Sequence, residues 1–299
     1  MAYGGPDRLE DVEPYILDVR NHRPTSASLI EEMKHRYARI GGRSPLLERT
    51  TAQASALGRA LRDAGLDVPV YVGMRHWHPY IRETLARMQA DGVTGAVGVV
   101  MAPHYSRMSI GAYERNVRDA GSSIDLRMIE SWHLLPEFLD AVHDRVMAAL
   151  RRFADAERDR VPVIFTAHSL PERILAGGDP YPAELAATFA ELRGRLGERD
   201  CRFAYQSAAM TPDAWLGPDA GTVMEALAAE GHRSILIAPI GFTSDHVEIL
   251  FDIDIEYRAL ADRLDIRLER IDMVNDDAGM MRGLARTVES RMRNAGWLA

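Results

Sequence analysis

Residues 161–172 read VPVIFTAHSLPE, and this stretch decides the fold class. Its first seven residues are apolar or uncharged on both alternating faces, and the run ends on the imidazole of His168. A strand that is apolar on both faces is typical of a parallel sheet covered by helices on both sides. Ligands bind at the carboxyl ends of such strands. The stretch therefore predicts a buried parallel strand that presents His168 to a site.

Other apolar runs of strand length recur along the chain, and stretches with helical periodicity separate most of them. This alternation indicates βαβ units and parallel sheets, and 299 residues suffice for two domains. We expect one domain over residues 1–105 plus 280–299 and a second over 106–279. The last helix, at 279–294, is expected to pack on the first domain. The other expected strands are 68–73, 95–102, 124–129, 201–205, 234–239 and 264–268, and the expected helices include 27–40, 51–64, 80–89, 137–153 and 183–196.

Composition excludes several classes of protein. A net charge of −8 argues against nucleic-acid binding, which needs a positive surface. No apolar stretch approaches the 18 residues of a membrane-spanning helix, and the first residues do not resemble a secretory signal. A single cysteine, Cys201, excludes an intramolecular disulfide and a four-cysteine zinc or iron–sulfur site. We therefore expect a cytoplasmic protein without stable membrane insertion.

A second stretch, GFTSDHVEILFDIDIE at 241–256, places five carboxylates within twelve residues, with no Lys or Arg among them. Unscreened like charges destabilise a helix by roughly 0.2–0.5 kcal/mol per i,i+4 pair, so such a run suggests that it receives a cation or protons. Glu248, Asp252 and Glu256 are spaced by four residues, which places them on one helical face and aligns them more closely on a π-type turn. The alternation over 251–257 also allows a half-buried strand with a solvated face.

Two further histidines, His76 and His78, follow the expected strand at 68–73. For these histidines, as for His168, a purely structural role is the alternative to binding. The sequence has no G-x-G-x-x-G, so a dinucleotide cofactor has no support.

Taken together, these segments resemble ferrochelatase, the enzyme that inserts iron(II) into a porphyrin. The resemblance implies two similar α/β domains, each a four-stranded parallel sheet flanked by helices, with the porphyrin in the cleft between them. It also implies a monomer that uses iron(II) as substrate, with no prosthetic group and no iron–sulfur cluster. The matching pieces are MAYG at 1–4, RY at 36–37, IGGRSPL at 40–46, PHYS at 103–106, AHSLP at 167–171, GDPY at 178–181, YQS at 205–207, WLGPD at 215–219 and GFTSDHVE at 241–248.

Within that family the chain is most similar to the soluble bacterial branch that acts on coproporphyrin III. The resemblance assigns His168 and Glu248 as the catalytic pair, with Asp252 and Glu256 as an acidic ridge, and all four as metal-binding. His168 is the expected base, with a pKa near neutral. The expected porphyrin-binding residues are Tyr3, Arg20, Arg36, Tyr37, Ser44 and Tyr113.

Three questions stay open at this stage. The same fold would also suit a non-catalytic protein that binds a tetrapyrrole or a metal, or a cobalt or nickel chelatase. The polar stretch at 20–43 favours coproporphyrin III, although protoporphyrin IX is also considered. Family members carry a short apolar strand before MAYG, so either the start lies upstream or the first domain lacks a central strand. Such a gap would leave neighbouring backbone groups unpaired.

Overall fold

The computed structural model describes residues 1–209, 211 and 213–298, and it divides into two compact units. The first comprises Met1–Trp132, Ser244–Val247 and Asn275–Ala299, and the second comprises His133–Thr243 and Glu248–Val274. The first unit thus continues past the expected boundary at 105. The reason is that β2 (Asp125–Ile129) pairs in parallel with β1 (Gly95–Val99), so the chain between them stays in the first unit.

The second unit contains a four-stranded parallel sheet in the order β4-β3-β5-β6. Its strands are β3 (Val163–His168), β4 (Cys201–Gln206), β5 (Ser234–Pro239) and β6 (Arg267–Arg270). The sheet confirms the expectation for the second domain. β6 begins later than the expected 264, because the amide of Leu264 still donates to Leu260 O at the end of a helix.

Helices cover both faces of this sheet, as the fully buried strands require. On one face, Ile164 and Ile237 pack in a cluster with Met224 of α10 (Ala220–Ala229). On the other, Phe165 stacks edge-on against Phe189 of α9 (Tyr181–Arg195). The other helical segments of this unit are α6 (Pro136–Leu150), α7 (Asp155–Arg158), α8 (Arg173–Ala176), α11 (Val247–Leu250), the π-helix η2 (Asp252–Tyr257) and α12 (Arg258–Arg263).

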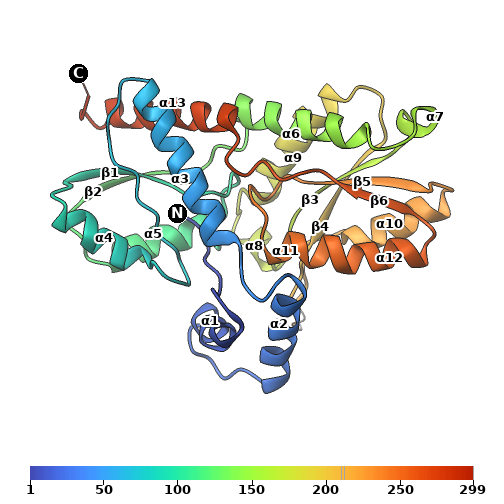
Figure 1. The fold of residues 1–299 in the computed structure, drawn as a ribbon, viewed down its shortest axis with the longest axis horizontal. Helices are drawn as coiled ribbons and strands as arrows, with labels where there is room; N and C mark the ends of the chain where they lie inside the picture. The colour runs from blue at the N-terminus through green and yellow to red at the C-terminus, as the bar shows by residue number, and fades with distance from the viewer. Residues whose placement is uncertain (210, 212, 299) are drawn as a thin grey trace. The chain divides into compact units, whose positions relative to one another are not determined.

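The first unit contains a parallel sheet of only two strands, β1 and β2, among the residues described. The expectation of four strands is therefore wrong here, and residues 68–73 form no strand. As expected, α13 (Ala278–Asn294) packs on this unit, against α3 (Leu46–Asp63) and both strands (Figure 1). The remaining helices are η1 (Leu9–Asp11), α1 (Val12–Val19), α2 (Ala27–Arg39), α4 (Ile81–Ala90) and α5 (Ile110–Asp119).

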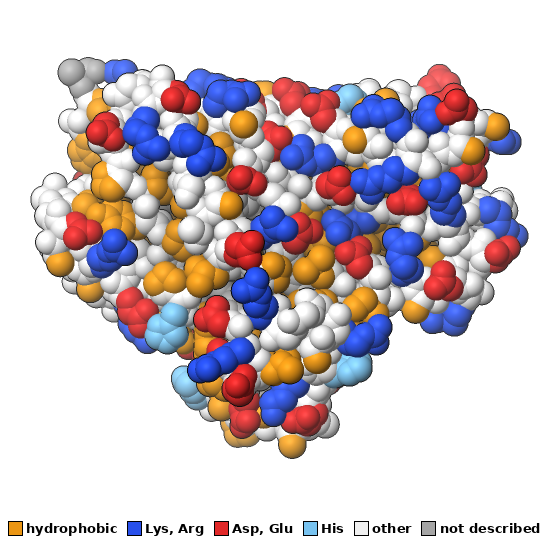
Figure 2. Space-filling model, in the orientation of Figure 1, with side chains coloured by type: hydrophobic (Ala, Val, Ile, Leu, Met, Phe, Trp, Pro, Cys, Tyr) orange, Lys and Arg blue, Asp and Glu red, His pale blue; other side chains and the backbone are white. Residues whose placement is uncertain are grey.

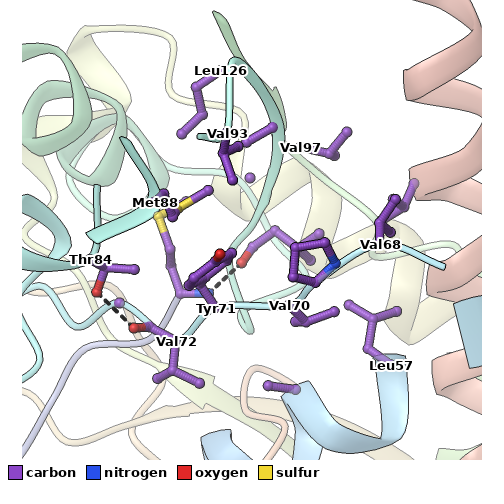
Figure 3. Close-up of a pocket in the computed structure, with 18 of the residues that line it drawn as sticks. Leu57, Val68, Val70, Tyr71, Val72, Thr84, Met88, Val93, Val97 and Leu126 are labelled. Atoms are coloured by element: carbon purple, nitrogen blue, oxygen red, sulfur yellow. Dashed lines mark hydrogen bonds between the residues drawn. The ribbon is translucent and has the colours of Figure 1, made fainter. Parts of the chain in front are cut away.

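An apolar pocket of about 230 Å³ lies beside 68–73, the segment that forms no strand. The pocket lies between that segment and β1, so the two backbones cannot pair (Figure 3). Met1 and Ala2 connect the two segments. The amide of Ala2 donates to Gly73 O (3.2 Å), and the Met1 amino group donates to Val99 O (2.6 Å). The pocket walls include Leu57, Val70, Val93, Val97 and Leu126.

Candidate active site

The site in the second unit is built on the carboxyl end of β3. His168 is the last residue of that strand, and its Nε2 lies 3.3 Å from Oε1 of Glu248 in α11. The chain that leads to α11 passes very close to β3, since a Cβ at Gly241 would lie 2.6 Å from that of Ala167. Glycine is therefore required at this crossing, and it lets the acidic segment approach the imidazole. The structure thus brings the predicted catalytic pair together.

Burial is the largest single influence on His168, and it lowers the pKa of the imidazole. The charge and hydrogen bond of Glu248, the carbonyl of Ser169 and the charge of Asp252 together outweigh burial and raise the pKa to about 9. His168 therefore holds a proton at pH 7 in the ligand-free protein. This differs from the expected near-neutral pKa, because the sequence alone did not show that a carboxylate contacts the ring.

The acidic ridge begins on a π-helix. The amide of Glu256 donates to Phe251 O, five residues earlier, over 3.0 Å. The π-type turn suggested by the spacing is confirmed, and the alternative of a half-buried strand is wrong. Asp252 is buried and accepts a hydrogen bond from Ser207 Oγ, whereas Glu256 is exposed.

Two of the five carboxylates are screened by residues distant in sequence. Asp254 makes a two-pronged ion pair with Arg270, at 2.8 and 2.9 Å. Asp245 accepts from Asn275 Nδ2 at 2.9 Å and lies 3.6 Å from Arg49. The repulsion among these carboxylates is therefore weaker in the folded protein than the sequence of the segment alone suggests.

In the first unit, Tyr3 and Tyr113 lie around one guanidinium. The Arg75 guanidinium carbon lies 5.6 Å from the Tyr3 ring centroid and 5.8 Å from that of Tyr113. Tyr3 also packs on His76, whose Nδ1 lies 2.7 Å from Asp18. Sequence reasoning missed Arg75, although its place after an apolar run, beside His76, was a usable signal.

The other expected porphyrin-binding residues lie nearby or on the α1–α2 hairpin. Ser44 is buried against Gly5, where an added Cβ would lie 2.4 Å from its hydroxyl, and the buried Tyr37 approaches the same glycine. Arg20 donates to Thr25 Oγ1 (3.0 Å), and Arg36 pairs with Glu32 (3.0 Å). Tyr3, Tyr37, Ser44 and Tyr113 are thus held by local packing, while the two arginines are held within the hairpin.

One other cluster has the composition of a metal site. Asp200, Glu230 and His232 bring their ligand atoms within 4.8 Å of one another. Arg202 occupies this cluster, however, with its guanidinium 2.9 Å from Asp200 and 2.6 Å from Glu230. A cation already neutralises these carboxylates, so the cluster is a surface ion-pair network.

Comparison with known proteins tests the assignment. The sequence profile of the ferrochelatase family matches residues 1–292. The chain belongs to the ferrochelatase family. It is 42% identical to a ferrochelatase of Herpetosiphon aurantiacus over 93% of this chain and 92% of that protein. It is 36% identical to a coproporphyrin III ferrochelatase of a Geobacillus species, over 98% and 96%.

The fold agrees with that of known chelatases. SirB from Bacillus subtilis, solved with Fe3+, superposes with a TM-score of 0.55 at 14% identity, covering 82% of this chain and 90% of SirB. Among the residues described, no helix of this ferrochelatase is long and apolar enough to span a bilayer. On the face drawn in Figure 2, acidic and basic side chains are interspersed, with no extended basic patch of the kind that nucleic acid requires.

Proposed function

We propose that this ferrochelatase inserts iron(II) into coproporphyrin III for heme biosynthesis, with His168 and Glu248 handling the metal and the porphyrin protons. The single observation that carries this proposal is the 3.3 Å contact between His168 Nε2 and Glu248 Oε1 at the end of a buried strand. Imidazole and carboxylate ligands suit iron(II) and also zinc(II), so strict metal selectivity is not expected.

The elevated pKa of His168 supports an order in which the metal binds before His168 accepts a porphyrin proton. Metallation must remove two protons from porphyrin nitrogens, so a base has to be unprotonated when they leave. In the ligand-free enzyme, Glu248 keeps the His168 pKa at about 9. A divalent cation bound by Glu248 would withdraw that carboxylate from the imidazolium and lower the pKa. His168 would then release its proton to solvent as the metal arrives, accept one porphyrin proton, pass it to solvent and accept the second.

Arg20 supports the choice of coproporphyrin III, which carries four propionates where protoporphyrin IX carries two. Among the residues described, its side chain donates only to the neutral oxygens of Thr25 and Pro24. A guanidinium without a carboxylate partner suits a propionate. The Geobacillus relative, which matches over nearly the whole chain, is itself a coproporphyrin III ferrochelatase.

A turnover measurement tests the function. The protein is mixed with excess porphyrin and either zinc(II) or, anaerobically, iron(II), and the absorption spectrum is followed. We expect many equivalents of metalloporphyrin per enzyme and a higher kcat/KM for coproporphyrin III than for protoporphyrin IX. Saturation at one equivalent would instead indicate a tetrapyrrole-binding protein.

Replacing Arg20 tests the substrate preference directly. We expect Arg20→Ala to reduce the coproporphyrin preference by about 1–3 kcal/mol, the usual cost of a lost charged hydrogen bond. The control is Arg23→Ala, which removes an exposed arginine from the same loop. Equal use of both porphyrins by the unmodified enzyme would contradict the preference and leave the ferrochelatase activity intact.

A further inference from the structure

Gln206, the last residue of β4, connects the two halves of the catalytic pair. It is fully buried and lies beside His168 in the parallel register. Its Oε1 accepts from Thr166 Oγ1 at 2.6 Å, and its Nε2 donates to the main-chain oxygen of Glu248 at 2.9 Å. One carboxamide therefore joins the strand that carries the imidazole to the helix that carries the carboxylate.

The next residue, Ser207, holds the ridge. Its φ of 60° lies in the left-handed region, which serine rarely adopts. In this conformation its hydroxyl donates to Asp252 on the π-helix. Two consecutive residues at one strand end thus contact two acidic residues that are four positions apart.

The residues around the hydrogen-bonded side chains of Thr166, Gln206 and Ser207 argue against a purely structural role for these polar groups. The adjacent buried positions of the same sheet, Ile164, Ala204 and Ile237, are apolar. A buried polar group costs free energy unless it is fully hydrogen-bonded, so an apolar residue would be the simpler choice for stability alone. The hydrogen bonds of Gln206 Nε2 and Ser207 Oγ lead to the acidic segment.

We propose that Gln206 and Ser207 are positioning residues for metal insertion. Gln206 fixes the Glu248 backbone opposite His168, and Ser207 fixes the carboxylate of Asp252. The inference rests on the proposed roles of His168 and Glu248. Because the two contacts reach different acids, they have separable kinetic consequences.

The first test replaces the carboxamide. Gln206→Met keeps the length of the side chain and removes its three hydrogen bonds, with Thr166, with the main chain of Glu248 and with Ser207 Oγ. We expect kcat to fall about 10–100-fold, the usual loss when a partner of a metal ligand is removed, while the Kd for porphyrin is unchanged. If this variant does not fold, Gln206→Asn keeps the carboxamide but is one methylene too short to bridge Thr166 and Glu248.

The second test separates the hydroxyl of Ser207 from its backbone. Ser207→Ala and Ser207→Gly both remove the donor to Asp252, but only glycine suits the left-handed conformation. We expect both to raise the KM for zinc(II) to a similar extent, although Ser207→Ala is the less stable. If the KM for zinc(II) rises only in the less stable Ser207→Ala and not in Ser207→Gly, the proposed role of the Ser207 hydroxyl is overturned.

A matched control lies in the first unit. Gln53 is also buried and donates Nε2 to a main-chain oxygen, that of Asn275, at 3.0 Å. We expect Gln53→Met to lower stability as Gln206→Met does and to leave kcat and the metal KM unchanged.

If both variants have the same kinetics, the role of Gln206 is overturned. If His168→Ala retains wild-type turnover, the proposed function of the pair fails as well, so the two failures are distinguishable.

Discussion

Both sheets of this ferrochelatase are parallel, but among the residues described the sheet of the second unit has four strands and that of the first unit has two. β3 has a hydrogen-bonded neighbour on each side, β4 and β5. β1 has β2 on one side and the apolar pocket on the other. An apolar run is therefore not sufficient for a strand, because pairing needs a partner about 4.8 Å away. The proposed catalytic pair lies on the sheet whose central strand is fixed on both sides.

The largest expected effect comes from breaking the site on the complete sheet. His168→Ala should reduce kcat by about 10²–10⁴-fold, the range for a lost general base, while porphyrin still binds. The measurement is the rate of zinc-porphyrin formation, with porphyrin binding followed by fluorescence.

The second unit also supplies a matched control for this substitution. His133 lies 3.3 Å from Glu184, the same separation as in the proposed pair. His133→Ala should keep wild-type turnover if the effect is specific to the site. Combining His168→Ala with Glu248→Gln should be no worse than the poorer single variant, and additive losses would argue against a shared step.

The next effect concerns the incomplete sheet. Met1 lies level with Val100, since it contacts Val99 O and the Met101 amide. Five apolar residues joined to the amino end of Met1 would therefore lie along β1. We expect a stabilisation on the order of a few kcal/mol, because aliphatic burial (~1.5–3 kcal/mol per side chain) and new hydrogen bonds (~1 kcal/mol each) together exceed the ordering cost of ~1–2 kcal/mol per residue.

Urea unfolding and hydrogen exchange measure this effect. The amides of β1 should become protected, while those of β3 should be unchanged. A matched extension of alternating glycine and serine should give no gain, since it buries no apolar surface. If the apolar extension leaves both stability and exchange unchanged, the pocket does not accept a strand.

A third difference concerns two imidazole–carboxylate pairs, one in each unit. Burial lowers the pKa of His76, and the hydrogen bond with Asp18 offsets this only in part. At His168 burial also lowers the pKa, but Glu248, together with the Ser169 carbonyl and Asp252, outweighs it and raises the pKa to about 9. Between pH 7 and 8.5, His76 should be neutral and His168 charged. NMR titration of the imidazole resonances measures both values.

Glu248→Gln isolates the cause of the elevated value. Without the carboxylate charge, burial should dominate and the His168 midpoint should move to lower pH, while the His76 midpoint stays in place. A His168 midpoint that remains near 9 in this variant would show that Glu248 is not the main cause.

The smallest effects belong to the ridge. Asp252→Asn and Glu256→Gln should raise the KM for zinc(II) a few-fold, about the factor that one screened charge contributes. Asp252→Asn should have the larger effect, because Asp252 is buried and contributes to the field at His168. Unchanged metal dependence in both variants would indicate that these acids are only solvated surface groups. Porphyrin affinity provides the control.

The sequence predicted the elements that can be recognised from their own composition and spacing. β3, β4 and β5 lie within a residue or two of the apolar runs, because strands buried on both faces must be apolar throughout. Local signals, an imidazole at a strand end and a dense acidic segment, marked the two halves of the site, and the resemblance to ferrochelatase assigned His168 and Glu248 as the proposed catalytic pair. The spacing of Glu248, Asp252 and Glu256 suggested the π-helix.

Elements that depend on tertiary contacts could not be predicted in this way. Residues 68–73 have the composition of a strand, but only the surrounding structure determines whether a partner strand lies beside them. The roles of Gln206 and Ser207 depend on the lateral register of β3 and β4, which no local pattern encodes. The pKa of His168 likewise depends on a contact between residues 80 positions apart in sequence.

The π-helix also has a genetic consequence. A π-helical turn is an α-helix with one residue inserted, and each residue advances an α-helix by about 100°. Deleting one codon within 253–255 would let the segment close as an ordinary α-helix. Glu256 and all of α12 would then keep nearly the same orientation relative to Glu248, because the wide turn already absorbs the extra residue, and every acidic side chain of the ridge could be retained. The gene can therefore lose one codon from this short segment without turning the helix that follows it.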